Sequence, residues 1–152
     1  MIKDSGERRE FNTGAVRDMP EGKGRCDLIP LKVAAVVLDA DYVLTKLDNF
    51  KQSGDVICLY GALGYAAVKL FKEVETAFLE VSKHFEEGAK KYGEYNWQKG
   101  IPVHSYIDSA VRHYLKHRRG DKDEAHDRAF IWNIMCAIWT IENKPEMNEY
   151  RK

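Results

Sequence analysis

Apolar side chains recur at helical spacing over most of the chain, and this periodicity is the feature that most constrains its fold. Between residues 63 and 92 the apolar positions are Val68, Phe71, Val74, Phe78, Val81 and Phe85. Because such spacing places side chains on one face of a helix, it predicts one long amphipathic helix over 63–92. Gly93 and the Asn96-Trp97 pair interrupt the pattern and predict the end of that helix.

The same spacing predicts three further helices. They are expected over residues 31 to about 50, about 105 to 118, and about 123 to 143, each with an apolar face. The short segment 55–60 fits either a strand or the entry to the next helix. The chain is therefore expected to be all-α.

The two ends of the chain differ from this helical region. Residues 1–30 are polar and rich in glycine and proline, which predicts an irregular arm. The tail 144–152 is expected to be frayed. The expected architecture is a single domain over 1–152, a bundle of about four main helices with a loop-rich N-terminal arm.

Composition excludes several classes of protein. The 24 basic and 24 acidic residues cancel, so no global field attracts nucleic acid or an anionic membrane, and an anionic ligand must be met by local charges. The three cysteines are isolated, which argues against a disulfide framework and favours a reducing cytoplasm. No apolar run approaches the roughly 20 residues that span a bilayer. The first ten residues lack the apolar core of a signal peptide.

A cluster of acids lies on the predicted long helix. Glu80, His84 and Glu87 are spaced to share one face, and Glu86 lies beside them. Carboxylates that project from helices are the usual helical ligands of Mg²⁺ and Mn²⁺. A solvated polar face explains the same acids, although the small Gly88-Ala89 pair would let another helix approach Glu87.

The next predicted helix carries Asp108 and, four residues on, Arg112. The two side chains suit a surface ion pair. They equally suit a site in which Asp108 binds a metal and Arg112 binds a phosphate, since the planar guanidinium matches phosphate oxygens. Both interpretations stay open.

Acids and a histidine gather where the last helix is expected to start, at Asp123, Glu124, His126 and Asp127. Helix capping and metal binding both account for them. The His126-Asp127 pair resembles the metal-binding pair of HD phosphohydrolases, but no properly spaced partner residues complete that pattern. Further along, an inward Asn133 must find hydrogen-bond partners.

Cations, an amide and an aromatic ring surround the turn after the long helix: Lys90, Lys91, Asn96 and Trp97. This set could hold phosphates and stack a base, or could form an ordinary capped helix end. The chain has no Walker loop, Rossmann glycine pattern or nucleophile elbow. Water activated by a metal is therefore the economical mechanism.

Several blocks, in this order, resemble one known family. They are TGAVRD at 13–18, GKGRCDLIP at 22–30, EGAKKYGEYNWQKGIP at 87–102, DSAVRH at 108–113, and DEAH followed by WN at 123–133. Together they are similar to the phage-encoded dATP/dGTP diphosphohydrolases (MazZ type), relatives of the all-α MazG-like nucleotide pyrophosphatases. The resemblance covers about residues 11–143, with a less distinctive span between 31 and 80.

The resemblance implies metal-dependent hydrolysis of dGTP, and of dATP, to the deoxynucleoside monophosphate and pyrophosphate. Water would attack the α-phosphate, with two or three Mg²⁺ or Mn²⁺ ions bound. In a phage the dGMP would supply synthesis of the modified purine 2-aminoadenine, in the host cytoplasm. MazG-like enzymes are typically dimers or tetramers, so a homo-oligomer is expected. An HD-type triphosphohydrolase and a non-enzymatic helical phage binding protein remain alternatives.

The family's metal-binding pattern is incomplete here, because Lys90 and Ser105 occupy two of its acidic positions. Glu86, Glu87 and Asp108 carry over as catalytic and metal-binding residues. Glu124 and His126 are proposed as substitute ligands on their chemistry alone. The expected substrate-binding residues are Lys90, Lys91 and Arg112 for the phosphates, and Asn96, Trp97, Arg25, Asp27 and Asn133 for the rest of the nucleotide.

Overall fold

The computed structural model describes residues 6–152 and confirms the all-α class. The elements, in chain order, are β1 (Arg8–Glu10), β2 (Val16–Asp18), η1 (Cys26–Leu28), α1 (Leu31–Val37), α2 (Tyr42–Ser53), α3 (Val56–Phe71), α4 (Val74–Tyr92), η2 (Asn96–Lys99), α5 (Val103–Arg119), α6 (His126–Asn143) and η3 (Pro145–Met147). The described part thus has six α-helices rather than about four, because two predicted helices are each divided.

The first division separates α1 from α2. Asp39 and Ala40 both adopt the left-handed conformation, with φ of 57°, which a continuing right-handed helix cannot contain. Asp41 then caps α2, its side chain accepting a hydrogen bond from the backbone N–H of Leu44 at 2.9 Å. The prediction of a single helix over 31–50 was wrong because apolar spacing continues across the break.

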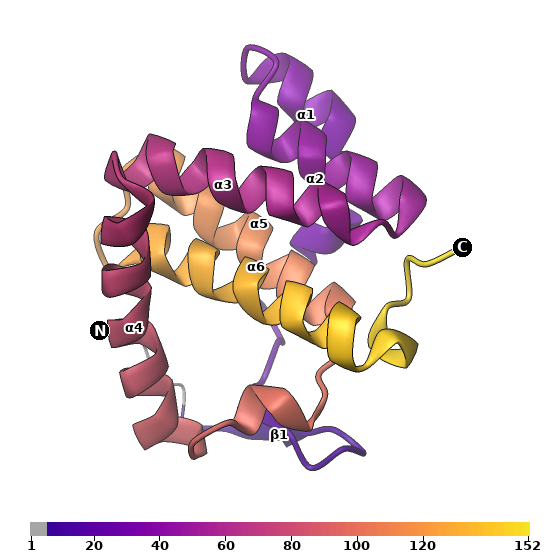
Figure 1. The fold of residues 1–152 in the computed structure, drawn as a ribbon, viewed down its shortest axis with the longest axis vertical. Coiled ribbons are helices and arrows are strands. Elements are labelled where there is room, and N and C mark those ends of the chain that lie inside the picture. The colour runs from indigo at the N-terminus through magenta and orange to yellow at the C-terminus, as the bar shows by residue number, and fades with distance from the viewer. Residues whose placement is uncertain (1–5) are drawn as a thin grey trace.

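The second division separates α3 from α4. Segment 55–60 is helical, since Asp55 caps α3 and accepts from the N–H of Ile57. The single helix expected over 63–92 is interrupted at Lys72, whose φ is 70°. After this residue α4 turns steeply away from α3 (Figure 1). The apolar residues on both sides of Lys72 keep helical spacing, so periodicity alone did not reveal the turn.

The core lies where α2 and α3 pack against the α5–α6 pair. In Figure 1, α3, α5 and α6 lie side by side, with α1 and α2 beyond them and α4 descending at one end. The largest fully buried side chains are Tyr106, Tyr114, Phe50, Phe130, Leu31, Leu44, Leu47, Leu59, Ile101, Ile107, Ile131 and Ile134. Among the described residues, no helix is both long and apolar enough to cross a membrane.

The N-terminal arm contains a short hairpin. β1 and β2 pair antiparallel, with Arg9 opposite Arg17. The Asn96 side chain holds this hairpin to η2, because its amide donates to the carbonyl of Val16 and accepts from the N–H of Val16, both at 2.9 Å. Residues 1–5 of the expected arm lie outside the described residues.

The C-terminal tail packs against the body, so the expectation of fraying was wrong. Asn148 is buried and donates to the carbonyl of Gly54 at 3.0 Å. The Tyr150 ring contacts Phe50 edge-on, with centroids 5.3 Å apart. Gly54 caps α2 with φ of 71°, and its lack of a side chain lets the backbone of Arg151 approach closely. These contacts order the tail, and its polar sequence alone did not predict this order.

Candidate functional site

A cavity of about 580 Å³ opens between the hairpin and helices α4, α5 and α6. This volume falls in the range of about 300–1,000 Å³ typical of small-molecule sites. The cavity is lined by Val16, Arg17, Asp18, Gly22, Lys23, His84, Gly88, Tyr92, Asn96, Ile101, Ser109, Arg112, His113, Lys116, Glu124, Trp132 and Asn133. We call it the large cavity.

Cations outnumber acids in the lining of the large cavity. Arg17, Lys23, Arg112 and Lys116 contribute positive charge, against the carboxylates of Asp18 and Glu124. Asp18 is already neutralised, since Lys91 and Arg8 bind it at 2.9 and 3.1 Å and Tyr92 donates to it at 2.9 Å. The lining therefore favours an anionic occupant.

Three buried nitrogen atoms of the lining lack protein hydrogen-bond partners within residues 6–152. They are Nη1 of Arg17, Nε of Arg112 and Nε1 of Trp132. A buried donor without an acceptor costs about 1–3 kcal/mol, so an acceptor supplied by a ligand would recover that free energy. These atoms mark where oxygen atoms of an occupant would be bound.

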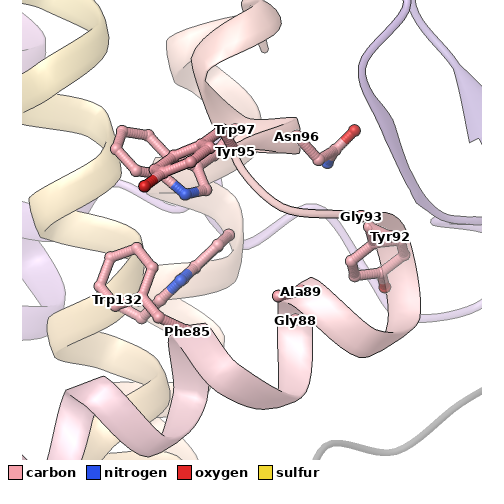
Figure 2. A pocket seen from close by; sticks show the side chains of 9 residues that line it. All are labelled: Phe85, Gly88, Ala89, Tyr92, Gly93, Tyr95, Asn96, Trp97 and Trp132. Carbon is pink, nitrogen blue, oxygen red and sulfur yellow. The ribbon is translucent and has the colours of Figure 1, made fainter.

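Aromatic rings form one wall of the site. Trp132 of α6 lies 5.9 Å from Phe85 and 6.1 Å from Tyr106, measured between ring centroids. Beside it is a second, narrow cavity of about 20 Å³, shown in Figure 2, where Trp132, Phe85 and Trp97 come together and Asn96 points away. Gly88 borders both cavities, and a Cβ atom there would meet no atom of residues 6–152 within 4 Å.

Imidazole groups lie at the lining of the large cavity or directly behind it, and the ring of His84 lies against the aromatic wall, 5.3 Å from Trp132 between ring centroids. Nδ1 of His113 lies 2.8 Å from Nδ1 of His126, and Nε2 of His126 lies 2.7 Å from Oδ1 of Asp123. Burial and the nearby His126 hold the pKa of His113 well below its ordinary value. Burial, followed by the charge of Arg128, lowers the pKa of His84 to about 4. His113 and His84 are therefore neutral at physiological pH.

Four of the expected site residues line the large cavity: Asn96, Arg112, Glu124 and Asn133. Asn133 is buried, donates to the carbonyl of Ala129 at 2.9 Å and accepts from Arg17 at 3.4 Å. Both polar groups of the Asn96 amide bind the Val16 backbone, so this residue shapes the cavity by positioning the hairpin. His126 lies behind the lining, in contact with His113.

Asp108 is buried and binds the η1 segment. Its Oδ1 accepts from the N–H of Cys26 at 2.6 Å, and its Oδ2 accepts from Arg112 at 2.7 Å. Of the two interpretations of Asp108 and Arg112, the ion pair is present, although it is largely buried rather than at the surface. Arg112 also donates to the carbonyl of Gly24 at 2.8 Å, so it joins α5 to the arm.

The acids of α4 have different surroundings. Glu87 accepts a hydrogen bond from Arg128 of α6 at 2.8 Å, and the neighbouring Glu86 is exposed. Glu87 and Asp108 thus have arginine partners on different helices. Of the lysines at the end of α4, Lys90 is exposed, whereas Lys91 binds Asp18 at the cavity edge.

The remaining expected residues lie outside the lining of the large cavity. Arg25 and Asp27 bind each other through two hydrogen bonds of 2.8 and 2.7 Å, and Asp27 is buried. Trp97 lines the narrow cavity and packs against Phe85, with centroids 5.6 Å apart.

Several lining residues were absent from the expected set: Arg17, Lys23, His84, Ser109, His113, Lys116 and Trp132. Arg17 and Lys23 lie within the TGAVRD and GKGRCDLIP blocks, so those blocks were the signal that could have found them. Lys116 and His113 lie on α5 beside Arg112 and therefore share its surroundings. Trp132 lies in the WN part of the block at 123–133, which was the signal that could have found it.

Comparison with known proteins gives one match. The model of the family described as dATP/dGTP diphosphohydrolase, N-terminal, matches residues 61–150, which is more than half of the chain. The matched region contains Arg112, Lys116 and Glu124, whereas Arg17 and Lys23 of the arm precede it. No curated protein and no solved structure matches.

Proposed function

The chain belongs to the dATP/dGTP diphosphohydrolase family, and from this premise we propose that it hydrolyses dGTP and dATP to the monophosphate and pyrophosphate in the large cavity. One observation carries the proposal. The large cavity joins four cationic side chains to an aromatic wall, and two of its guanidinium groups have buried nitrogen atoms that find no hydrogen-bond partner among residues 6–152. A purine nucleoside triphosphate combines the anionic and the flat apolar groups that complement such a lining.

The cations would bind the triphosphate. Arg17 and Arg112 offer planar, forked donors that suit phosphate oxygens, and Lys116 and Lys23 add point charges. Charge on the α-phosphate and on the departing pyrophosphate grows as water attacks, so fixed cations that neutralise it lower the barrier. Lys90 and Lys91, also expected at the phosphates, would act from the rim, Lys91 through its ion pair with Asp18.

The aromatic wall would bind the purine. Trp132 and Tyr92 line the large cavity, and stacking of a base on an aromatic ring contributes about 1–3 kcal/mol. Asn133 is the lining amide best placed to bind the sugar or base. Asn96 and Trp97 would support this wall from behind, since the first positions β2 and the second packs on Phe85.

The residues present fit a divalent cation. Among residues 6–152, two groups have donor atoms close enough to bind one ion: His113, Glu124 and His126, and Asp121, Asp123 and His126. A bound Mg²⁺ or Mn²⁺ would supply charge neutralisation and a more acidic water. Of the expected metal ligands, Glu124 and His126 belong to these groups, and we propose them as ligands of the ion. Glu86, Glu87 and Asp108 belong to neither group, and their role as ligands remains a prediction.

The wider biological role rests on the family alone. We propose that the protein acts in the cytoplasm of a phage-infected cell and supplies dGMP for 2-aminoadenine synthesis. We also propose that it is a homo-oligomer. Several large apolar side chains of α1 and α3 are exposed, and a subunit contact would bury them; they are Val33, Val36, Val37, Ile57, Tyr60, Tyr65 and Val68.

The test is incubation with each deoxynucleoside triphosphate in turn, in the presence of Mn²⁺, with the products identified by ion-exchange chromatography. We expect dGMP or dAMP together with pyrophosphate. Release of the deoxynucleoside with intact triphosphate would support the HD-type alternative instead. The absence of both hydrolysis and nucleotide binding would support a non-enzymatic role.

A further inference from the structure

The turn between α5 and α6 brings three side chains with potential metal ligands together at the wall of the large cavity. Gly120 ends α5 in the left-handed conformation, with φ of 92°, and the chain then reverses into α6. His113 of α5, Glu124 of the turn and His126 at the start of α6 have donor atoms that all lie within 4.8 Å of one another. His113 and Glu124 line the large cavity, and His126 is 2 % exposed.

The proton arrangement on His126 is determined by Asp123. A carboxylate only accepts hydrogen bonds, so Nε2 of His126, at 2.7 Å from Asp123 Oδ1, carries the proton. In the neutral ring the other nitrogen, Nδ1, carries the lone pair and accepts a hydrogen bond from Nδ1 of His113 at 2.8 Å, so a metal ion would take the place of that shared proton. An imidazole held by a carboxylate through one nitrogen is the usual arrangement of a histidine that binds metal through the other.

We propose that His113, Glu124 and His126 form a cation site that selects a first-row transition metal such as Mn²⁺ over Mg²⁺, with Asp123 as a positioning residue. Two nitrogen ligands held ~2.1 Å from one ion at neighbouring positions are about 3 Å apart, and the two Nδ1 atoms are 2.8 Å apart. Imidazole nitrogen suits transition metals, whereas Mg²⁺ prefers oxygen ligands and retains its water.

The position of the site gives it a role in the proposed function, on which that role rests. Arg112 and Lys116 line the same cavity as His113 and Glu124. Their positive charge weakens, without preventing, the binding of a cation in the empty cavity, and an anionic triphosphate that enters between them offsets this repulsion. The nucleotide therefore strengthens binding of the ion, and by reciprocity the ion strengthens binding of the nucleotide.

The experiment is a calorimetric titration of the full chain with Mn²⁺, and separately with Mg²⁺, in the absence of nucleotide. We expect one Mn²⁺ to bind and Mg²⁺ to bind at least tenfold more weakly. His113→Ala and Glu124→Gln should abolish Mn²⁺ binding. Asp123→Asn should weaken it by about 10–100-fold, because the substitution removes the carboxylate that orients His126. His117→Ala, four residues further along α5, is the matched control and should bind as the unaltered chain does.

The proposal is overturned if the unaltered chain does not bind Mn²⁺, if it binds Mg²⁺ equally well, or if the His113 and Glu124 variants bind Mn²⁺ normally. Circular dichroism verifies that each variant is folded, and Asp123→Asn, at an exposed residue, keeps the test valid if His113→Ala does not fold. Because no nucleotide is present, the result is independent of the hydrolysis assay. Mn²⁺ binding without hydrolysis would leave this site standing and contradict only the proposed function.

Discussion

The guanidinium of Arg17 donates to the hydroxyl of Ser109 at 2.8 Å and thereby joins the N-terminal hairpin to α5. The same group lies over the Tyr106 ring, 5.2 Å from its centroid, and its buried Nη1 has no hydrogen-bond partner among the described residues 6–152. Arg17 is therefore held at the cavity wall with a donor group that no described residue accepts from. That arrangement suits a residue that binds a phosphate oxygen.

Replacing Arg17 with lysine should weaken nucleotide binding. Arg17→Lys retains the positive charge but loses the forked donors, and a hydrogen bond to a charged group contributes about 1.5–3 kcal/mol. We expect the KM for dGTP to rise tenfold or more. The matched control is Arg9→Lys, since Arg9 lies opposite Arg17 in the hairpin and binds Ser105 at 3.2 Å, outside the lining. Equal effects of both variants would contradict the prediction.

A bulky residue at Gly88 should block the cavity without unfolding the protein. Gly88 borders both cavities, and in the described part of the chain no atom lies within 4 Å of where its Cβ would be. Glycine inside a helix is about 1 kcal/mol less favourable than alanine, so Gly88→Leu should keep or raise the melting temperature while nucleotide binding falls. Gly64→Leu on α3 is the control, because Gly64 is helical, has equal space and lies outside the lining. Unchanged dGTP binding in Gly88→Leu would contradict the assignment of the site.

Stability should fall as the pH falls from about 6.5 to 4, in part because of His84. The folded state lowers the pKa of His84 to about 4, whereas the unfolded chain has the ordinary value. Between these pH values the unfolded state binds a proton at His84 that the folded state does not. The free energy of unfolding therefore decreases as the pH falls, and His84 contributes at most about 3 kcal/mol to that decrease. Urea denaturation gives the free energy of unfolding of the unaltered chain and of His84→Gln, and the difference between the two should become smaller as the pH falls. If the two free energies change with pH in parallel, His84 is not a cause of the loss of stability.

Asp108→Asn distinguishes the two interpretations of Asp108. Its carboxylate is buried and accepts from a backbone N–H and from Arg112. Removing one partner of a buried ion pair typically costs about 3–5 kcal/mol, because the other charge is left without compensation. We expect a clear loss in the free energy of unfolding with Mn²⁺ affinity unchanged. Loss of Mn²⁺ binding with stability preserved would instead establish Asp108 as a metal ligand.

The contact of the tail with Gly54 is testable with a matched pair of glycines. A Cβ at Gly54 would lie 2.4 Å from the Cα of Arg151, whereas a Cβ at Gly120 would meet nothing within 4 Å. Both glycines end helices in the left-handed conformation, which costs other residues about 1–2 kcal/mol. Gly54→Ala should therefore destabilise the protein more than Gly120→Ala and expose the tail to carboxypeptidase. Equal melting temperatures would indicate that the tail contributes no stability.

Apolar spacing was sufficient to predict the class of the fold and the approximate extents of α5 and α6, because a buried helix face leaves a local, repeating trace in the sequence. It did not reveal the turns at Asp39-Ala40 and at Lys72, since a left-handed residue changes the direction of the chain without changing the apolar pattern. The tail was misjudged for a related reason. The order of the tail depends on contacts with Gly54 and Phe50, which are distant in sequence. Asn148, for example, lies 94 residues from its partner Gly54.

The sequence by itself determined the all-α class, the balanced charge that requires any anion to be bound locally, and the set of blocks that identifies the family. Only the tertiary structure decided which of many acids, histidines and cations share a site. It paired Glu87 with Arg128, and Asp108 with Arg112 and Cys26, and it brought Arg17 of the arm and His113 of α5 to the same cavity. The physical reason is that ligand chemistry depends on distances of a few ångströms between side chains far apart in the chain, and only packing of the helices sets those distances.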